Sequence, residues 1–320
     1  MASCAGSVDA LDLATGTERW RYRTGRDGPP ANFHSEPVLT DGGVSFAGDK
    51  EPEARVYAFD RGSGSVRWSR AFGGGVYSDL LRHGDDILVY TRRGDAVALR
   101  IATGEVKWTF RDGPRQTARP PSAPVLIGGR YVFAAHPADV IALDADTGAI
   151  SWRATLAGDP STSVVVAAGA LLVGTRAGHF YRLDPGSGSV LARLDAGGRP
   201  KGTPVVGSGG VLALVGDSLA CLDPSLEGVR WRAVNPGGWS SPRPLVRDGE
   251  VIVGTVGGSV VAFSMEGKER WRLQVTGEVR GLGSAGDVLL IGTRQGTFYA
   301  VGLAGAPQPA GLGKGAGRPR

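Results

Sequence analysis

The residue types that most often perform chemistry are few in this 320-residue sequence, and they are widely spaced. The four histidines lie in unrelated settings: His34, His83, His136 and His179. A metal site would need several such side chains to converge, and these belong to different segments of the chain. We therefore expect surface or loop histidines, no catalytic, metal-binding or cofactor-binding residue set, and no enzyme activity.

The two cysteines, Cys4 and Cys221, lie far apart in the sequence, and no disulfide is predicted. No apolar segment accompanies Cys4, so the sequence as given predicts neither a signal peptide nor a lipoprotein signal. No apolar run approaches the ~18 residues that a membrane-spanning helix requires. We expect no transmembrane segment, and the compartment stays open.

Arginine carries most of the charge, and it offers one candidate binding surface. The net charge is +5 and the isoelectric point about 9.4. The basic residues are spread along the chain, with no basic stripe interleaved with aromatic residues, so nucleic-acid binding is not predicted. The Thr-Arg-x-Gly sequence recurs at Thr175 and Thr293, and Thr91-Arg92-Arg93-Gly94 is related to it.

Loop arginines could therefore gather at one rim of the molecule and bind an acidic segment of a partner protein or peptide. A second interpretation is that they only solvate turns. Trp239 lies in a glycine-rich loop, either exposed as an anchor or packed against the fold. The predicted partner-binding residues are Arg26, Arg92, Arg115, Arg119, Arg176, Arg294 and Trp239.

The elements that must position these loops come from one repeated stretch. Its best copy runs from Val140 to Trp152, with Asp144 as anchor, a turn at Gly148 and Trp152 beyond it. The copies recur about every 41 residues. Their anchor positions are Asp12, Asp60, Arg100, Asp144, Asp184, Asp223, Ser264 and Gly302.

The repeat predicts a β-hairpin that needs a neighbour. The apolar run before Asp144 is typical of a buried strand, and the carboxylate of Asp144 can pin the tight turn. Gly148 supplies a positive φ, and Trp152 lies on the returning strand. A single hairpin cannot cover its own indole, so we expect each tryptophan to be shielded by the adjoining copy.

One copy departs from the pattern at two positions. Arg182 replaces the usual small residue before the anchor, and Ala192 replaces the tryptophan. Our interpretation is a compensated change, in which the arginine stem covers the space that the indole leaves. Two independent losses are the alternative.

These repeats predict an all-β fold, a single β-propeller of four-stranded antiparallel blades, most simply with seven blades and otherwise with eight. The last repeat lacks a fourth strand and the first begins in mid-blade, so we expect the N- and C-terminal strands to close the ring together. The predicted organisation is an N-terminal flank over 1–6, the propeller over 7–303 and a disordered tail over 304–320. We expect a monomer.

The pattern Ala-x-Asp-x-x-(Thr/Ser)-Gly-x-x-x-Trp resembles the repeat of the pyrroloquinoline-quinone-like (PQQ-like) β-propellers, over about residues 7–303. That family includes quinoprotein alcohol dehydrogenases, the outer-membrane assembly lipoprotein and sensor propellers of actinobacterial Ser/Thr kinases. The dehydrogenases use adjacent cysteines, which Cys4 and Cys221 are not. The resemblance therefore implies a non-catalytic scaffold, and an envelope location if a longer precursor exists.

Two other functions stay open. The chain could bind a small molecule such as a quinone, as an enzyme or a sensor, and a bound quinone would absorb visible or near-ultraviolet light. It could also be the sensor part of a larger Ser/Thr kinase-type protein, which the neighbouring coding sequence would reveal.

Overall fold

In this computed structural model, the regular elements of the described residues are all β-strands. The structure describes residues 6–24, 37–40, 42–48, 54–76, 78–112, 123–135, 137–235, 237–240, 243–303 and 310–311. The first fourteen strands are β1 (Ser7–Leu11), β2 (Glu18–Arg23), β3 (Val38–Thr40), β4 (Gly43–Ala47), β5 (Ala54–Asp60), β6 (Val66–Phe72), β7 (Leu81–His83), β8 (Asp86–Tyr90), β9 (Asp95–Arg100), β10 (Val106–Arg111), β11 (Val125–Ile127), β12 (Arg130–Ala135), β13 (Asp139–Asp144) and β14 (Ile150–Thr155).

The remaining strands continue the same pattern to the end of the described chain. They are β15 (Val165–Ala167), β16 (Ala170–Gly174), β17 (His179–Leu183), β18 (Val190–Asp195), β19 (Pro200–Gly207), β20 (Gly210–Val215), β21 (Ser218–Leu222), β22 (Val229–Val234), β23 (Leu245–Arg247), β24 (Glu250–Gly254), β25 (Ser259–Ser264), β26 (Glu269–Gln274), β27 (Val279–Ala285), β28 (Val288–Thr293), β29 (Phe298–Gly302) and β30 (Ala310–Gly311).

Seven four-stranded antiparallel sheets and one two-stranded sheet account for these strands. From β3 onward, each group of four consecutive strands forms one sheet, paired in sequence order. This is the all-β, seven-bladed β-propeller fold that the repeats predicted. From Asp60 onward, the anchor residues end the third strands or directly follow them, so the repeat and the sheet are the same unit.

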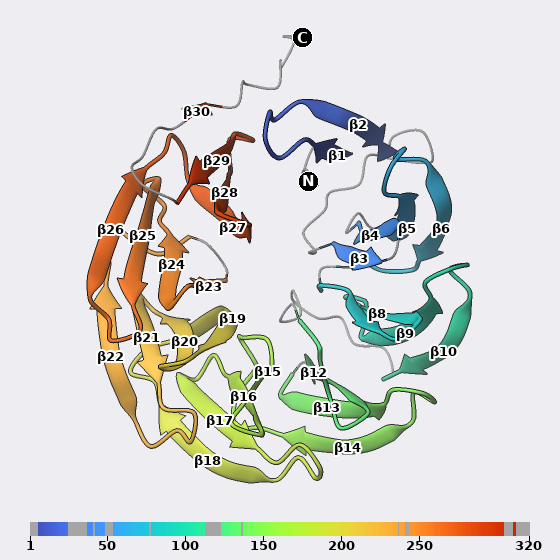
Figure 1. Cartoon of the computed structure of the whole chain (residues 1–320). Coiled ribbons are helices and arrows are strands. Elements are labelled where there is room, and N and C mark those ends of the chain that lie inside the picture. The colour runs from blue at the N-terminus through green and yellow to red at the C-terminus, as the bar shows by residue number, and fades with distance from the viewer. Residues whose placement is uncertain are drawn as a thin grey trace. The chain divides into compact units, whose positions relative to one another are not determined.

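The chain divides into two compact units. The first comprises residues 1–164 and the turn segment 183–190, and the second comprises 165–182 and 191–320. Within the first unit, the sheets β3–β6, β7–β10 and β11–β14 follow one another along an arc, with β6, β10 and β14 on its convex side (Figure 1). In the second unit, β22 and β26 likewise lie on the convex side (Figure 1).

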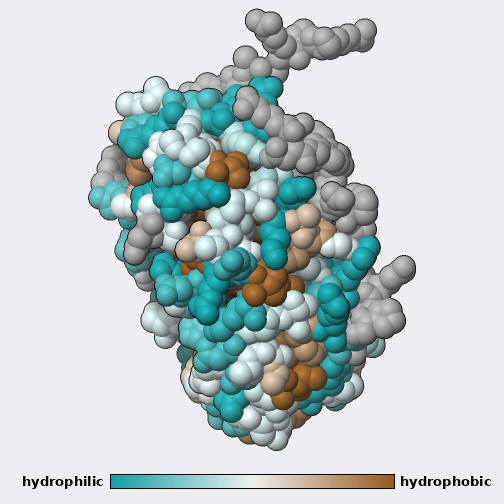
Figure 2. All heavy atoms as spheres, turned by 90° about the vertical axis from the view of Figure 1, so that its right-hand side faces the viewer, coloured by the Kyte–Doolittle hydropathy of each residue, from teal (hydrophilic) through white to brown (hydrophobic). Residues whose placement is uncertain are grey.

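Burial explains the residue pattern of the strands. The second strands β4, β8, β16 and β20 are buried along their whole length and are mostly apolar, because neighbouring sheets cover both faces. The fourth strands, such as β6, alternate between exposed and partly buried residues, because one face meets solvent. On the face seen in Figure 2, apolar residues form separate small patches among hydrophilic ones.

The strand that completes the last sheet differs from the prediction. We expected the N-terminal strand with Trp20 to pair beside β29, but β2 pairs with β1 in a sheet of their own. The edge of β29 is instead occupied by β30, with Tyr299 opposite Gly311. The pairing therefore uses two residues of the segment expected to be a disordered tail, and the other residues of that tail lie outside the described part of the chain.

Candidate functional site

Five tryptophans link their sheet to the next one and so hold the turns in place; they lie on β2, β6, β10, β14 and β22. In five copies the indole N–H donates a hydrogen bond to the carbonyl of the residue that follows the next anchor. These bonds are Trp20 to Arg61 (2.9 Å), Trp68 to Ile101 (2.8 Å), Trp108 to Ala145 (3.1 Å), Trp152 to Pro185 (3.0 Å) and Trp231 to Met265 (2.7 Å). The expected shielding of the indoles is confirmed most clearly at Trp108 and Trp152, which are buried.

The same indole explains why the next turn needs glycine. Gly148 has a φ of 74°, and a Cβ placed on it would lie 2.5 Å from Cε3 of Trp108. A side chain there would overlap the ring and also occupy the left-handed region. The same close approach occurs where Trp20 faces Gly64, at 2.5 Å.

The anchor aspartates act within their own turns. One carboxylate oxygen of Asp60 accepts hydrogen bonds from the N–H groups of Gly62 (3.0 Å) and Ser63 (2.9 Å). The ion pair with Arg67 holds the pKa of Asp60 well below its usual range. At Asp12, the hydrogen bond from Arg19 and those from the turn lower the pKa to about 2. These carboxylates are structural and are not free to act as acids or bases near neutral pH.

The copy without a tryptophan is completed by a residue that the sequence analysis overlooked. Leu226, in the following turn, is 4 % exposed and packs in the cluster that contains Ala192 and Leu194. It has a positive φ of 61°. A Cβ on Gly228 would meet nothing within 4 Å, and Gly228 does not have a positive φ. Leu226 thus supplies apolar filling in the copy that lacks the indole, and Arg182 is half-buried.

The Thr-Arg-x-Gly sequences form one kind of turn, between the second and third strands of their sheets. In each, the threonine N–H donates to the carbonyl four residues on, at 2.8 Å in Thr175 and 2.9 Å in Thr91 and Thr293. Thr255 forms the same turn, with Val256 in the position that arginine takes in the others. The search for Thr-Arg-x-Gly could not find this turn, because it has no arginine.

The structure brings some of the predicted binding residues into these turns and leaves others undescribed. Arg26, Arg115 and Arg119 lie outside the described residues. Arg92 belongs to the first unit and is half-buried, whereas Arg176 and Arg294 belong to the second unit and are exposed. The two exposed arginines therefore occupy equivalent positions in two sheets of one unit.

Arg294 contributes to a small charged group in the second unit. The carboxylate of Glu278 lies 3.3 Å from Nη1 of Arg294 and 3.2 Å from Nη1 of Arg280. The Arg294 side chain is 67 % exposed, and that of Arg280 is 54 % exposed. One acidic group between two exposed guanidinium groups leaves a net positive charge at the surface.

Trp239 is part of the core and is not an exposed anchor. It is 5 % exposed and meets Phe263 edge-on, with ring centroids 6.0 Å apart. Its indole N–H donates to the carbonyl of Asp217 at 3.0 Å. The second of our two interpretations, packing against the fold, describes its position.

The described residues contain no group of three or more His, Cys, Asp or Glu side chains that could hold a metal ion. His83 meets the ring of Tyr131, and His179 lies 3.0 Å from Arg193 through Nε2. Burial raises the pKa of the Cys221 thiol. Across the described part of the chain, no helix is both long and apolar enough to cross a membrane.

Three known proteins place these features in context. The Ser/Thr-protein kinase AfsK of Streptomyces griseus is 33 % identical over 184 residues, which is 54 % of this chain and 22 % of the kinase. The outer membrane protein assembly factor BamB of Yersinia pestis is 28 % identical over 155 residues, which is 46 % of this chain and 39 % of that protein. The matches thus span less than half of these relatives.

Similarity in structure extends over more of the chain. The crystal structure of BamB from Moraxella catarrhalis superposes with a TM-score of 0.76 at 18 % identity, covering 92 % of this chain and 88 % of that one. The sequence profile of the family described as outer membrane protein assembly factor BamB matches residues 5–176 and 176–305. The chain therefore belongs to the BamB family of PQQ-like repeat β-propellers.

Proposed function

We propose that this protein is a non-catalytic scaffold that binds a protein or peptide partner. The binding surface is the end of the second unit where the second-to-third-strand turns lie. The observation that carries the proposal is the exposure of Arg176 and Arg294 at equivalent positions of the same turn, in a chain of the BamB family.

Charge supports an acidic partner segment. In an antiparallel sheet, the start of the first strand lies at the same end as the turn between the second and third strands. The basic residues described at this end of the second unit are Arg176, Arg199, Lys201, Arg243, Arg280 and Arg294. The acidic residues described there are fewer: Asp195, Asp217 and Glu278. A basic rim of this kind steers and orients an acidic segment.

The test uses a fluorescent peptide of alternating glutamate and glycine, with binding followed by fluorescence anisotropy. The double variant Arg176→Glu, Arg294→Glu should weaken binding at least about tenfold, because it reverses two charges at the surface. Adding Arg92→Glu tests whether the equivalent turn of the first unit contributes. Binding should also fall as salt rises, because exposed charges are screened.

A matched control separates this surface from overall charge. The double variant Lys268→Glu, Arg270→Glu makes the same charge change at exposed positions of the second unit, in the β25–β26 turn and on β26, at the opposite end of the sheet. It should keep wild-type affinity. Equal losses in the two double variants, or unchanged binding in both, would contradict the proposed surface.

A second candidate is a sensor propeller, which the partial match to the kinase AfsK favours. A quinone-type ligand would give the purified protein absorption in the visible or near-ultraviolet region, beyond its aromatic residues. A spectrum without such absorption after incubation with a soluble quinone supports the scaffold.

A further inference from the structure

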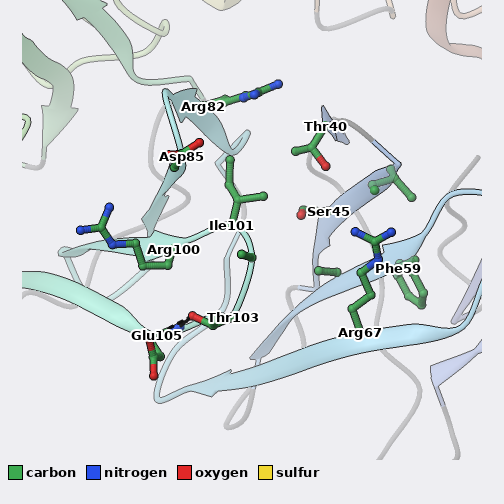
Figure 3. Close-up of a pocket in the computed structure, with 14 residues that line it drawn as sticks. Thr40, Ser45, Phe59, Arg67, Arg82, Asp85, Arg100, Ile101, Thr103 and Glu105 are labelled. Carbon is green, nitrogen blue, oxygen red and sulfur yellow. Dashed lines mark hydrogen bonds between the residues drawn. The ribbon is translucent and has the colours of Figure 1, made fainter.

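The first unit contains a groove of about 600 Å³ that the proposed function does not use. It lies between the sheets β3–β6 and β7–β10, beside the turns that carry the anchors Asp60 and Arg100 (Figure 3). Ala58 and Ile101 provide apolar lining, and the other lining groups include hydroxyl and charged side chains. A volume of this size is typical of small-molecule sites.

The groove exists where one core residue has been replaced. Ser45 pairs with Ala58, the small residue of its repeat, across β4 and β5. In the other sheets with a described register, the residue opposite that small residue is aliphatic. Those residues are Leu88, Val132, Leu212, Ile252 and Leu290. A serine here removes the side-chain volume that fills the equivalent space elsewhere.

Ser45 also presents a polar group to the groove. Ser45 lines the groove and is only 1 % exposed. A serine hydroxyl can donate one hydrogen bond and accept others. A polar group of a ligand in the groove can therefore bond to it.

Two arginines reach the same side of the groove. The side chains of Arg67 and Arg82 point toward the side that carries Thr40 and Ser45, whereas that of Arg100 points away (Figure 3). Nη2 of Arg67 donates to Gly42 O at 2.9 Å and to Asp60 at 2.8 Å, which fixes the guanidinium and leaves its other N–H groups available. Two guanidinium groups beside two hydroxyl groups suit a carboxylate.

The opposite side of the groove has the opposite charge. Asp85 and Glu105 line it from the sheet β7–β10. Arg82 comes from the same sheet, but its Nη1 lies 3.5 Å from Leu39 O of β3, across the groove. The β3–β6 side of the lining thus carries Arg67 and hydroxyl groups, and both carboxylates of the lining lie on the β7–β10 side.

We propose that this groove binds a small zwitterion of the amino-acid or short-peptide class. Its carboxylate lies against Ser45, Arg67 and Arg82, and its ammonium group faces Asp85 and Glu105. The side chain or backbone between the two charges rests on Ala58 and Ile101. This site is independent of the partner-binding surface on the second unit.

Isothermal titration calorimetry with the whole chain tests this directly. Tri-alanine with free ends should bind, and its C-terminal amide and its N-acetyl form should each bind at least about tenfold more weakly, because each has lost one charge. Free alanine binding as well as tri-alanine would assign the site to amino acids, and weaker binding of alanine would assign it to peptides. Both results support the proposal.

Two variants locate the binding in the groove. Ser45→Leu restores the aliphatic residue of the other sheets, so it should fold normally, fill the groove and abolish binding. Arg82→Gln changes an exposed side chain and should weaken binding at least about tenfold. If Ser45→Leu misfolds, the binding measured for Arg82→Gln tests the proposal instead.

Arg230→Gln is the matched control. Arg230 contacts the carbonyl of Gly209 and the anchor Asp223 in its own sheet, as Arg67 contacts Gly42 and Asp60. It should bind tri-alanine like the wild type, whereas Arg67→Gln should not. The proposal is overturned by any of three results: no binding of tri-alanine or alanine, equally tight binding of acetate or inorganic phosphate, or unchanged binding in both Ser45→Leu and Arg82→Gln.

Discussion

Two turns of the second unit solve the same packing problem in different ways. In the β25–β26 turn, Gly267 has a φ of 84° and donates its N–H to Ser264 O. In the β21–β22 turn, Leu226 has a φ of 61° and donates its N–H to Asp223 O. Both residues are three positions after the anchor. Gly267 lies under the indole of Trp231, whereas Leu226 belongs to the cluster against which Ala192 packs.

The difference shows that the turn residue must match the fourth-strand residue of the preceding sheet. A Cβ on Gly267 would lie 2.6 Å from Cδ2 of Trp231, so an indole excludes any side chain there. Where the indole is absent, Leu226 fills the space from the other side, despite the cost of a left-handed conformation for a leucine. The side chain that fills the space can come from the fourth strand of one sheet or from the turn of the next, but not from both.

Removing the indole should have the largest effect. Trp231→Ala deletes a large side chain and its hydrogen bond to Met265 O, and should lower the free energy of unfolding by ~3–5 kcal/mol in urea denaturation. Adding Gly267→Leu should recover part of that loss, because the pair then imitates Ala192 and Leu226. A double variant less stable than Trp231→Ala alone would refute the pairing.

Crowding the indole should have the next largest effect. Gly267→Leu in the wild-type background forces a side chain against Trp231 and into the left-handed region, and should cost ~3 kcal/mol by the same measurement. Gly228→Ala is the control, because nothing lies within 4 Å of its Cβ position and its φ is ordinary. It should change stability by less than ~0.5 kcal/mol.

Removing the Leu226 side chain from the turn should lower stability somewhat less. Leu226→Ala removes buried methyl groups from the cluster against which Ala192 and Leu194 pack, and should lower the free energy of unfolding by ~2–3 kcal/mol. A second substitution, Leu226→Gly, loses the same contact but relieves the left-handed strain. Should Leu226→Gly prove the less stable of the two, strain at this position would be unimportant.

The smallest effect concerns pH in the turns themselves. The folded pKa of Asp12 is depressed to about 2 by Arg19 and the turn N–H groups, so its stabilising contribution is complete above its unfolded pKa and is lost as pH falls toward 2. The amide signals of Ala14 and Thr15, which donate to Asp12, should shift over that range in NMR spectra. In Asp12→Asn they should not shift, and a midpoint near pH 4 in the wild type would contradict the depressed pKa.

Much of the fold could be predicted from the residues. The period of the anchors, the turn glycines and the tryptophans identified sheets of four strands and the contact between them, because each feature depends on a few neighbouring residues. The short first strands, such as β7 (Leu81–His83), were less predictable, because little local pattern marks where an innermost strand starts pairing.

The candidate site was predictable only in part. The Thr-Arg-x-Gly spacing identified turns that the structure places at equivalent positions, with Arg176 and Arg294 exposed. It could not identify Thr255, whose turn has the same hydrogen bonds without the arginine. Nor could it distinguish a buried Trp239 from an exposed one, because a glycine-rich loop permits both.

By itself the sequence determined the repeating unit, because the anchor, the glycine and the indole are chemical requirements of one hairpin and its neighbour. Tertiary structure alone decided which residue fills a missing tryptophan, which strand completes β29, and that Ser45 faces a groove. Each of those outcomes depends on contacts between segments that are distant in the chain or in different sheets, where residue type fixes the volume required but not which residue provides it.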